Sequence, residues 1–389
     1  MDPTKRLVSL DAFRGFVMLL MISAGFGIPE MAKQAVGSDP DSIWQTLAPL
    51  FQHVPWIGCA PWDMIQPSFM FMVGVAMPFS YLKRRMRGEG FWSMSWHALT
   101  RAVLLVLLAV VLSTPASATQ TTWVFTNVLA QIGLGYFFLF LLWRLGPEYE
   151  ISAILVIVVG YWAYFYTFTP VDDLASLKLA AEPGTQLTGF MAPWSKHINA
   201  GADFDRWFLN LLPRSTPFVV NAGGYVTLNF VPALATMLMG SLTGRFLMRS
   251  EKGTKGRVVT LVVAGLLLVA VGVAAGYTVC PVVKRIWTPS WTLFSGGLVL
   301  ILLAAFYLVV EGFGWRWLVM PFVVVGMNSI FAYVVDLMAQ RGIWERLQPH
   351  LPDAWLETEY LPIIHHCGVL LVIWLLCFWL YRQRAFLRL

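Results

Sequence analysis

His53 and Asp63 are the side chains of this sequence best suited to proton transfer. They flank the stretch HVPWIGCAPWDM, directly before an apolar run. Imidazole titrates near pH 6.5 and can accept and return a proton at physiological pH, and a neighbouring carboxylate can orient the ring or stabilise its charged form. Pro55, Gly58 and Pro61 interrupt the segment between them, so one continuous helix is not expected to hold the pair. The two residues are a candidate catalytic dyad, with an ordinary interfacial histidine as the alternative.

Other polar residues stand in equally apolar surroundings. Asp11 and Arg14 are three positions apart in SLDAFRGF, so on a helix they share a face and can pair. A charge at the centre of a bilayer costs roughly 2.5–3.5 kcal/mol, which favours partners or a function for such groups. The pair is either structural, closing a helix end, or functional. Gln131, Asn229 and Asn328 are amides inside apolar segments, where the usual role is a hydrogen bond between helices.

The elements that must position these residues are membrane-spanning helices. Of the 389 residues, 58% are hydrophobic and only 12% are charged, which is typical of a membrane protein. A helix needs about 20 apolar residues to cross the hydrocarbon layer. Ten segments qualify, near 12–29, 61–82, 98–115, 124–143, 151–169, 225–247, 258–279, 291–311, 317–338 and 362–381. The sequence therefore predicts an all-α polytopic bundle of about ten helices.

Lysine and arginine in short loops predict the orientation, because they collect on the cytoplasmic side. The basic segments near 5–6, 83–87, 245–257 and the C-terminal YRQRAFLRL fall on one side if the spans alternate, which places both termini in the cytoplasm. Four cations fall on the opposite side against this trend: Lys284, Arg285, Arg341 and Arg346. We expect a multi-pass protein of the inner (cytoplasmic) membrane.

The whole chain, 1–389, is predicted to be a single transmembrane domain. Periplasmic loops are expected near 30–60, 170–224 and 339–361, the last as a short amphipathic helix at the interface. The net charge of +6 is explained by topology, and no basic soluble face for nucleic acid is visible. No clustered Cys/His spacing predicts a metal site.

Six stretches follow one another in a characteristic order along the chain. They are SLDAFRGF, HVPWIGCAPWDMIQPSFMFMVGVAMPFS, FTNVLAQIGLGY, DFDRWFLNLLP, GGYVTLNFVPALATMLMGSLTGRF and VVVGMNSIFAYVV. This ordered set resembles the heparan-alpha-glucosaminide N-acetyltransferase family and its bacterial relatives, within the wider transmembrane acyltransferases. The resemblance implies a multi-helix membrane enzyme that takes acetyl-coenzyme A from the cytoplasm and moves its acetyl group to an amino sugar or glycan on the periplasmic side.

The resemblance also bears on individual residues. His53 matches the catalytic histidine of the family, and the first motif is matched by Asp11, Phe13, Arg14 and Gly15. Two positions depart from the animal members, which carry asparagine near the position of Gly25 and in place of Ile57. The chain therefore resembles a bacterial branch, whose acceptor need not be that of the animal enzyme.

Acetyl transfer needs a base, donors for the developing oxyanion and a path for the pantetheine arm. His53 is expected to act as general base or, in the covalent alternative, to carry the acetyl group, with Asp63 orienting it. Contacts with acetyl-coenzyme A, whose phosphates suit arginine, are expected from Asp11, Arg14, Arg84, Arg85, Arg101, Gln131 and Asn328. Contacts with the acceptor are expected from Trp56, Asp205, Arg206, Trp207 and Asn229. Gln131, Asn229 and Asn328 are also candidate oxyanion donors.

Structural alternatives stand beside these roles. The positive-inside rule by itself fills cytoplasmic loops with cations, and Trp207 is equally compatible with an interfacial anchor. A different function class also fits, a proton-coupled transporter or flippase of a sugar or lipid-linked sugar in which His53 and Asp63 relay protons. The sequence leaves the oligomeric state open, a homodimer included.

Overall fold

A computed structural model describes residues 7–36, 41–170 and 173–387. Helices build this part of the chain, and its β pairing is a single antiparallel bridge between Ile57 and Val283. Eight helices are long and apolar enough to cross a membrane, and two bent helix pairs raise the number to ten. The predicted all-α polytopic bundle is confirmed. Lys5 and Arg6, used for the orientation, lie outside the described residues.

The spanning helices follow the predicted segments closely. The eight long helices are α4 (Ile65–Met86, preceded by a 3₁₀ turn at Pro61–Met64), α5 (Phe91–Ser113), α6 (Val128–Leu145), α7 (Pro147–Tyr166), α9 (Phe230–Arg249), α10 (Thr254–Thr278), α11 (Pro289–Tyr307) and α15 (Leu361–Arg382). The bent pairs are α1 (Val8–Ile22) with α2 (Ile28–Ala35), at 43°, and α12 (Met320–Met327) with α13 (Ser329–Leu347), at 77°.

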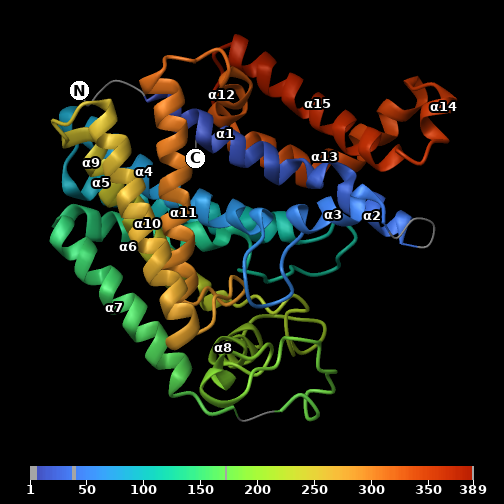
Figure 1. Cartoon of the computed structure of the whole chain (residues 1–389), viewed down its shortest axis with the longest axis horizontal. Helices are drawn as coiled ribbons and strands as arrows, with labels where there is room; N and C mark the ends of the chain where they lie inside the picture. Colours follow the sequence, from blue (N-terminus) through green and yellow to red (C-terminus); the bar gives the residue numbers. More distant parts are fainter. Residues whose placement is uncertain (1–6, 37–40, 171–172, 388–389) are drawn as a thin grey trace.

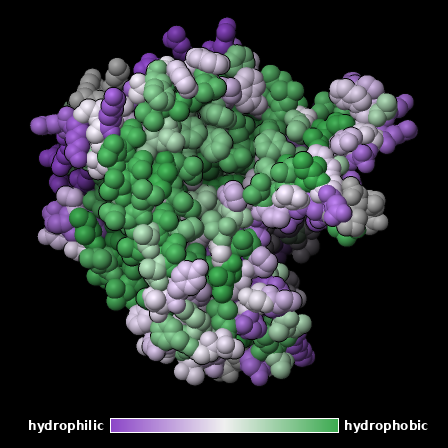
Figure 2. Space-filling model, in the orientation of Figure 1, coloured by the Kyte–Doolittle hydropathy of each residue, from purple (hydrophilic) through white to green (hydrophobic). Residues whose placement is uncertain are grey.

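Burial separates central helices from peripheral ones. The apolar windows of α4 and α9 are 72% buried, whereas those of α7, α10 and α15 are only 17% buried. Figure 2 shows the resulting apolar surface over α10 and α11, which lies between hydrophilic residues at the top left and a mixed surface around α8 (Ala200–Leu209) at the bottom. A hydrophobic belt between two polar ends is what a bilayer requires of a bundle.

Glycines bring the central helices together, as expected for small residues at helix interfaces in membranes. A Cβ on Gly240 of α9 would lie 2.0 Å from the carbonyl oxygen of Phe71 on α4, and a Cβ on Gly74 of α4 would lie 1.8 Å from the carbonyl oxygen of Met237. Only glycine allows the two backbones to approach this closely. The close approach therefore fixes α4, the helix that directly follows Asp63, against α9.

The bundle has two chemically distinct ends. We call the end with residues 83–90 and the α9–α10 connection the basic end, and the end with residues 48–64, 173–229 and 279–288 the loop end. Figure 1 shows the loop end around α8, at the bottom of the view, and the α9–α10 connection at the top. That the basic end faces the cytoplasm stays a prediction from its charge.

The three predicted loops contain helical turns. Residues 30–60 hold the end of α2 and α3 (Ile43–Leu47), and α8 lies within 170–224. The segment 339–361 differs from the expected interfacial helix, because α13 continues through it to Leu347 and only one further turn, α14 (Asp353–Leu356), follows. Apolar periodicity does not reveal where a bent span ends and an interfacial helix begins.

Candidate active site

His53 and Asp63 meet at the loop end. His53 Nδ1 lies 2.8 Å from Asp63 Oδ1, and the Asp63 side chain is 1% exposed while that of His53 is 39% exposed. The other carboxylate oxygen, Oδ2, accepts hydrogen bonds from the backbone N–H groups of Val54 (3.3 Å) and Ala60 (3.0 Å). One carboxylate therefore folds the interrupted segment back on itself and holds the imidazole at the same time.

Three contacts hold the segment between His53 and Asp63 against the rest of the loop end. The Ile57–Val283 bridge and a hydrogen bond from Gly58 N–H to the Val282 carbonyl (2.9 Å) join it to the α10–α11 connection. The buried Trp56 donates its indole N–H to the Trp194 carbonyl (2.9 Å). Trp56 thus anchors the segment, and its predicted acceptor contact is not supported by an exposed ring.

Lys284, in the α10–α11 connection, completes a three-residue cluster. Its Nζ lies 3.2 Å from Asp63 Oδ1 and 3.1 Å from His53 Nδ1. Burial lowers the pKa of the Lys284 ammonium from about 10.5 to about 8, although Asp63 opposes the shift. Burial raises the pKa of the neighbouring Cys59 thiol to about 12, with Asp63 adding to the effect. Cys59 therefore stays a thiol and is not an acyl acceptor at neutral pH.

A cavity of about 290 Å³ opens beside His53. In the described part of the chain, His53 Nε2 has no hydrogen-bond partner, whereas Nδ1 is occupied. Gln66, one turn after Asp63 on α4, also lines this cavity; it is 8% exposed, and its Nε2 lacks a partner among the described residues. The cavity thus presents a free imidazole nitrogen and a free amide donor.

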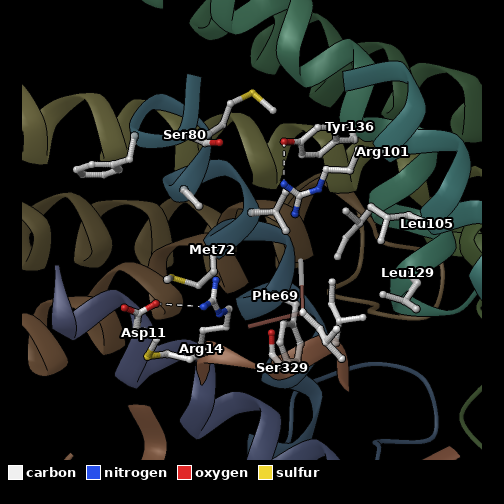
Figure 3. Close-up of a pocket in the computed structure, with 18 of the residues that line it drawn as sticks. Asp11, Arg14, Phe69, Met72, Ser80, Arg101, Leu105, Leu129, Tyr136 and Ser329 are labelled. Atoms are coloured by element: carbon white, nitrogen blue, oxygen red, sulfur yellow. Dashed lines mark hydrogen bonds and ion pairs between the residues drawn. The ribbon is translucent and has the colours of Figure 1, made fainter. Parts of the chain in front are cut away.

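A larger cavity of about 650 Å³ opens at the basic end. Its lining carries one carboxylate, from Asp11, and five cations: Arg14, Lys83, Arg84, Arg87 and Arg101. Figure 3 shows Arg14 and Arg101 on different walls of this cavity, the first bonded to Asp11 (3.1 Å) and the second to the Tyr136 hydroxyl (3.1 Å). An excess of cations around a concave space suits a ligand with several phosphates.

The two cavities meet between α1, α6 and α13. Met21, Val128 and Tyr333 line both of them, and we call these three residues the neck. These three largely apolar side chains are therefore walls of both cavities. The two cavities are thus adjacent, with cations that suit phosphate around one and His53 beside the other.

The predicted contacts with the coenzyme divide into two groups. Asp11, Arg14, Arg84 and Arg101 line the basic cavity, whereas Arg85 is exposed and lines neither cavity. The predicted Asp11–Arg14 pair is present, and Arg14 Nε also donates to the Gly326 carbonyl (2.7 Å). Arg84 binds Glu89 (2.9 Å) and faces His97 Nε2 (3.0 Å).

The three amides bind backbone groups instead of facing either cavity. Gln131 donates to the Phe125 and Thr227 carbonyls (2.7 and 3.1 Å), and Asn229 donates to the Arg285 carbonyl (2.9 Å). Asn328 donates to the Ala385 carbonyl (3.1 Å) and accepts from Leu387 N–H (3.0 Å), so it holds the C-terminal segment at the α12–α13 bend. These contacts match the structural alternative, and none of the three amides lines either of these two cavities.

The three predicted acceptor residues of α8 point to different surroundings. Asp205 is buried and accepts from Thr227 N–H (2.9 Å), and burial raises its pKa to about 6. Arg206 donates to the His197 carbonyl and to Asp203 (both 3.1 Å). Trp207 is 61% exposed. Because none of them lines either cavity, the structure does not bring them together with His53.

Comparison with known proteins gives a distant match. No protein-family model matches the chain. The heparan-alpha-glucosaminide N-acetyltransferase of Mus musculus is 24% identical over 386 residues, which cover 90% of this chain and 55% of the mouse protein. The Homo sapiens protein is 24% identical over 365 residues, 85% of this chain and 52% of the human protein. The chain is thus similar, at a distant level, to two proteins named as N-acetyltransferases. It spans about half the length of the curated relatives it matches.

Lys284 and Gln66 are the site residues that sequence reasoning missed. The resemblance to the heparan-alpha-glucosaminide N-acetyltransferases points to His53 but not to its neighbour 231 positions away. One signal for Lys284 was present, since it is a cation on the side that the positive-inside rule disfavours. Gln66 follows Asp63 by three positions and so shares its helix face, which is a weaker signal.

Proposed function

We propose that this protein is a membrane-embedded acetyltransferase that moves an acetyl group from acetyl-coenzyme A to an amino sugar or glycan. The observation that carries the proposal is a pair of adjacent cavities, one lined by five cations at the basic end and the other by His53 at the loop end, with the three neck residues lining both. The distant relatives, whose printed name is an N-acetyltransferase, support the same reaction.

Acetyl-coenzyme A enters from the basic end in this proposal. The phosphates contact arginines such as Arg14 and Arg101, whose planar guanidinium groups bind phosphate oxygens in pairs. Extended phosphopantetheine reaches roughly 20 Å, less than the roughly 30 Å hydrocarbon layer. The thioester must therefore meet the acceptor inside the bundle, and the neck and the cavity beside His53 provide that position.

The chemistry uses the free nitrogen of the imidazole. With Nδ1–H donated to Asp63, His53 Nε2 accepts a proton from the acceptor amine as the amine nitrogen attacks the thioester carbonyl. The new C–N bond replaces the C–S bond, and the departing thiolate takes the proton from the imidazolium. The products are coenzyme A and an acetamide, and the base is restored.

Gln66 is the proposed donor to the oxyanion of the tetrahedral intermediate. Its unpartnered amide lines the same cavity as Nε2 of His53, and a preorganised donor in a water-poor site stabilises developing negative charge strongly. Gln66 takes the role that the sequence assigned to Gln131, Asn229 and Asn328, whose amide nitrogens are occupied elsewhere.

The direction of transfer is proposed from charge. The basic end faces the cytoplasm, where acetyl-coenzyme A is made, and the loop end faces the periplasm of an inner-membrane protein. The acceptor then approaches His53 from outside the cell membrane.

The test is acetyl transfer by the purified full chain. Labelled acetyl-coenzyme A and glucosamine are supplied in detergent, and labelled N-acetylglucosamine is measured. His53→Ala is expected to reduce the rate by roughly 10²–10⁴, whereas His350→Ala, at an exposed site that lines neither cavity, leaves it unchanged. Proton-driven sugar uptake in proteoliposomes, without acetyl transfer, would refute the proposal and favour the transporter alternative.

A further inference from the structure

Lys284 lies within hydrogen-bond distance of both His53 and Asp63. Its side chain is 4% exposed, with Nζ 3.1 Å from His53 Nδ1 and 3.2 Å from Asp63 Oδ1. The Ile57–Val283 bridge, immediately before Lys284, fixes the two backbone segments at this distance. A single ring nitrogen thus faces both a carboxylate and an amine.

The protonation of Asp63 and Lys284 determines which ring nitrogen of His53 carries the proton. Nδ1 carries a proton and donates to Asp63, or it carries a lone pair and accepts from the Lys284 amine. In the first tautomer Nε2 has the lone pair that a general base needs. In the second tautomer Nε2 carries the proton and cannot act as a base. A charged ammonium favours the second tautomer through a charge-assisted hydrogen bond to Nδ1.

We infer that Lys284 is a positioning residue that selects the tautomer of His53, holding the base idle while the ammonium is charged and releasing it when the amine is neutral. The catalytic meaning of this inference rests on the proposed acetyl transfer. The tautomer selection itself does not, and it can be measured without any acetyl transfer.

The surroundings of Lys284 leave its charge weakly compensated. Asp63 is the carboxylate in contact, Cys59 remains a neutral thiol, and the Tyr225 ring lies 5.9 Å from Nζ. Arg285, next in the chain, adds a like charge while its guanidinium donates to the Gly223 and Val54 carbonyls. No second anion contacts Nζ among the residues that the structure describes. Burial accordingly lowers the pKa of Lys284 to about 8, so its charge changes just above neutral pH.

The test follows the reactivity of the His53 ring with pH. Diethyl pyrocarbonate acylates an unprotonated imidazole nitrogen, and the labelled peptide is quantified by mass spectrometry. In the wild-type protein the labelling rate is expected to rise about tenfold between pH 7 and pH 9, following the uncharged fraction of a group with a pKa of about 8. Exposed His350 in the same digest is the internal reference, because it contacts neither Lys284 nor Asp63.

Two substitutions, one that removes the charge of Lys284 and one that keeps it, distinguish selection of the His53 tautomer from a purely structural role. Lys284→Met removes the ammonium, and we expect its His53 labelling to reach the high plateau with the His350 profile. Lys284→Arg keeps a permanent cation, and we expect low labelling up to pH 9. If Lys284 had only a structural role, the rate of His53 labelling would change in the same direction in both variants.

Each outcome bears on the inference. A wild-type His53 profile identical to that of His350 overturns it even if neither variant folds, and so does an unchanged step in Lys284→Met. Transfer of labelled acetyl to glucosamine is measured on the same preparations. The labelling step without any acetyl transfer supports the role of Lys284 and refutes the proposed function, so the two failures are distinguishable.

Discussion

Asp63→Asn separates two tasks of one buried carboxylate. In the native protein Oδ2 accepts the backbone N–H groups of Val54 and Ala60, and Oδ1 faces His53 and Lys284. Asparagine supplies one oxygen, which the two backbone donors retain. Its amide nitrogen then faces the ring, so Nδ1 becomes an acceptor and the ring proton moves to Nε2. The base is lost although the side chain keeps its shape.

Two magnitudes follow from this geometry. Loss of the base-competent tautomer is expected to lower kcat by roughly 10²–10⁴, while the KM for acetyl-coenzyme A is expected to be unchanged because the proposed phosphate contacts lie at the opposite end. The variant also leaves Lys284, 4% exposed, without its carboxylate. Removing one partner of a buried ion pair costs about 3–5 kcal/mol. At about 2 °C per kcal/mol for a large chain, Tm should fall by roughly 6–10 °C.

The double variant Asp63→Asn with Lys284→Met distinguishes the two effects. Removing the orphaned ammonium is expected to restore most of the lost Tm, measured by thermal unfolding in detergent at pH 7, without restoring kcat. A double variant as unstable as Asp63→Asn would refute the explanation by an unpaired charge. An Asp63→Asn protein with wild-type kcat would refute the role of Asp63 in holding the imidazole.

Four further substitutions test the two cavities, the neck and the buried carboxylate of α8. Arg101→Met is expected to raise the KM for acetyl-coenzyme A about tenfold or more, the loss of one charged hydrogen bond, with exposed Arg85→Met as the unaffected control; equal effects would mean that the cavity cations act only through topology. Gln66→Met should lower kcat by roughly 10²–10³ with little change in KM, and a change in KM alone would contradict an oxyanion role. Met21→Ala should widen the neck, so that the kcat/KM ratio of butyryl- to acetyl-coenzyme A rises by roughly tenfold; an unchanged ratio would exclude the neck as the acyl filter. Asp205 has a pKa raised to about 6 from 3.8, so the free energy of unfolding falls as pH rises from about 4 to 6, and Asp205→Asn is expected to remove that dependence and stabilise the protein by up to about 3 kcal/mol at pH 7, as thermal unfolding across this pH range would reveal.

The membrane class and the spanning helices were predictable because they depend on local composition. Runs of apolar residues identify the spans without any knowledge of their partners. The pairing of Asp11 with Arg14 was predictable for the same reason, since helix periodicity alone brings them together. The bends within the α1–α2 and α12–α13 pairs were not, because tertiary contacts such as those of Asn328 with the C-terminal segment stabilise them.

The candidate site was only half predictable. His53 and Asp63 were identified by their chemistry, but their contact depends on a folded segment of prolines and glycines that no periodicity describes. Lys284 comes from another connection and reaches them through a bridge between Ile57 and Val283. The contact of Trp56 was equally hidden from the sequence, since its indole donates to the carbonyl of Trp194, 138 positions away.

The position of the neck between the two cavities determines where the transmembrane voltage acts. If water fills both cavities, the transmembrane voltage falls mainly across the layer of protein that contains Met21, Val128 and Tyr333. In the proposed reaction an uncharged thioester would cross this layer without an electrical cost, whereas an anionic thiolate would gain or lose about 2.3 kcal/mol for each 100 mV. If coenzyme A returns as a neutral thiol, the turnover rate would not depend on the membrane potential.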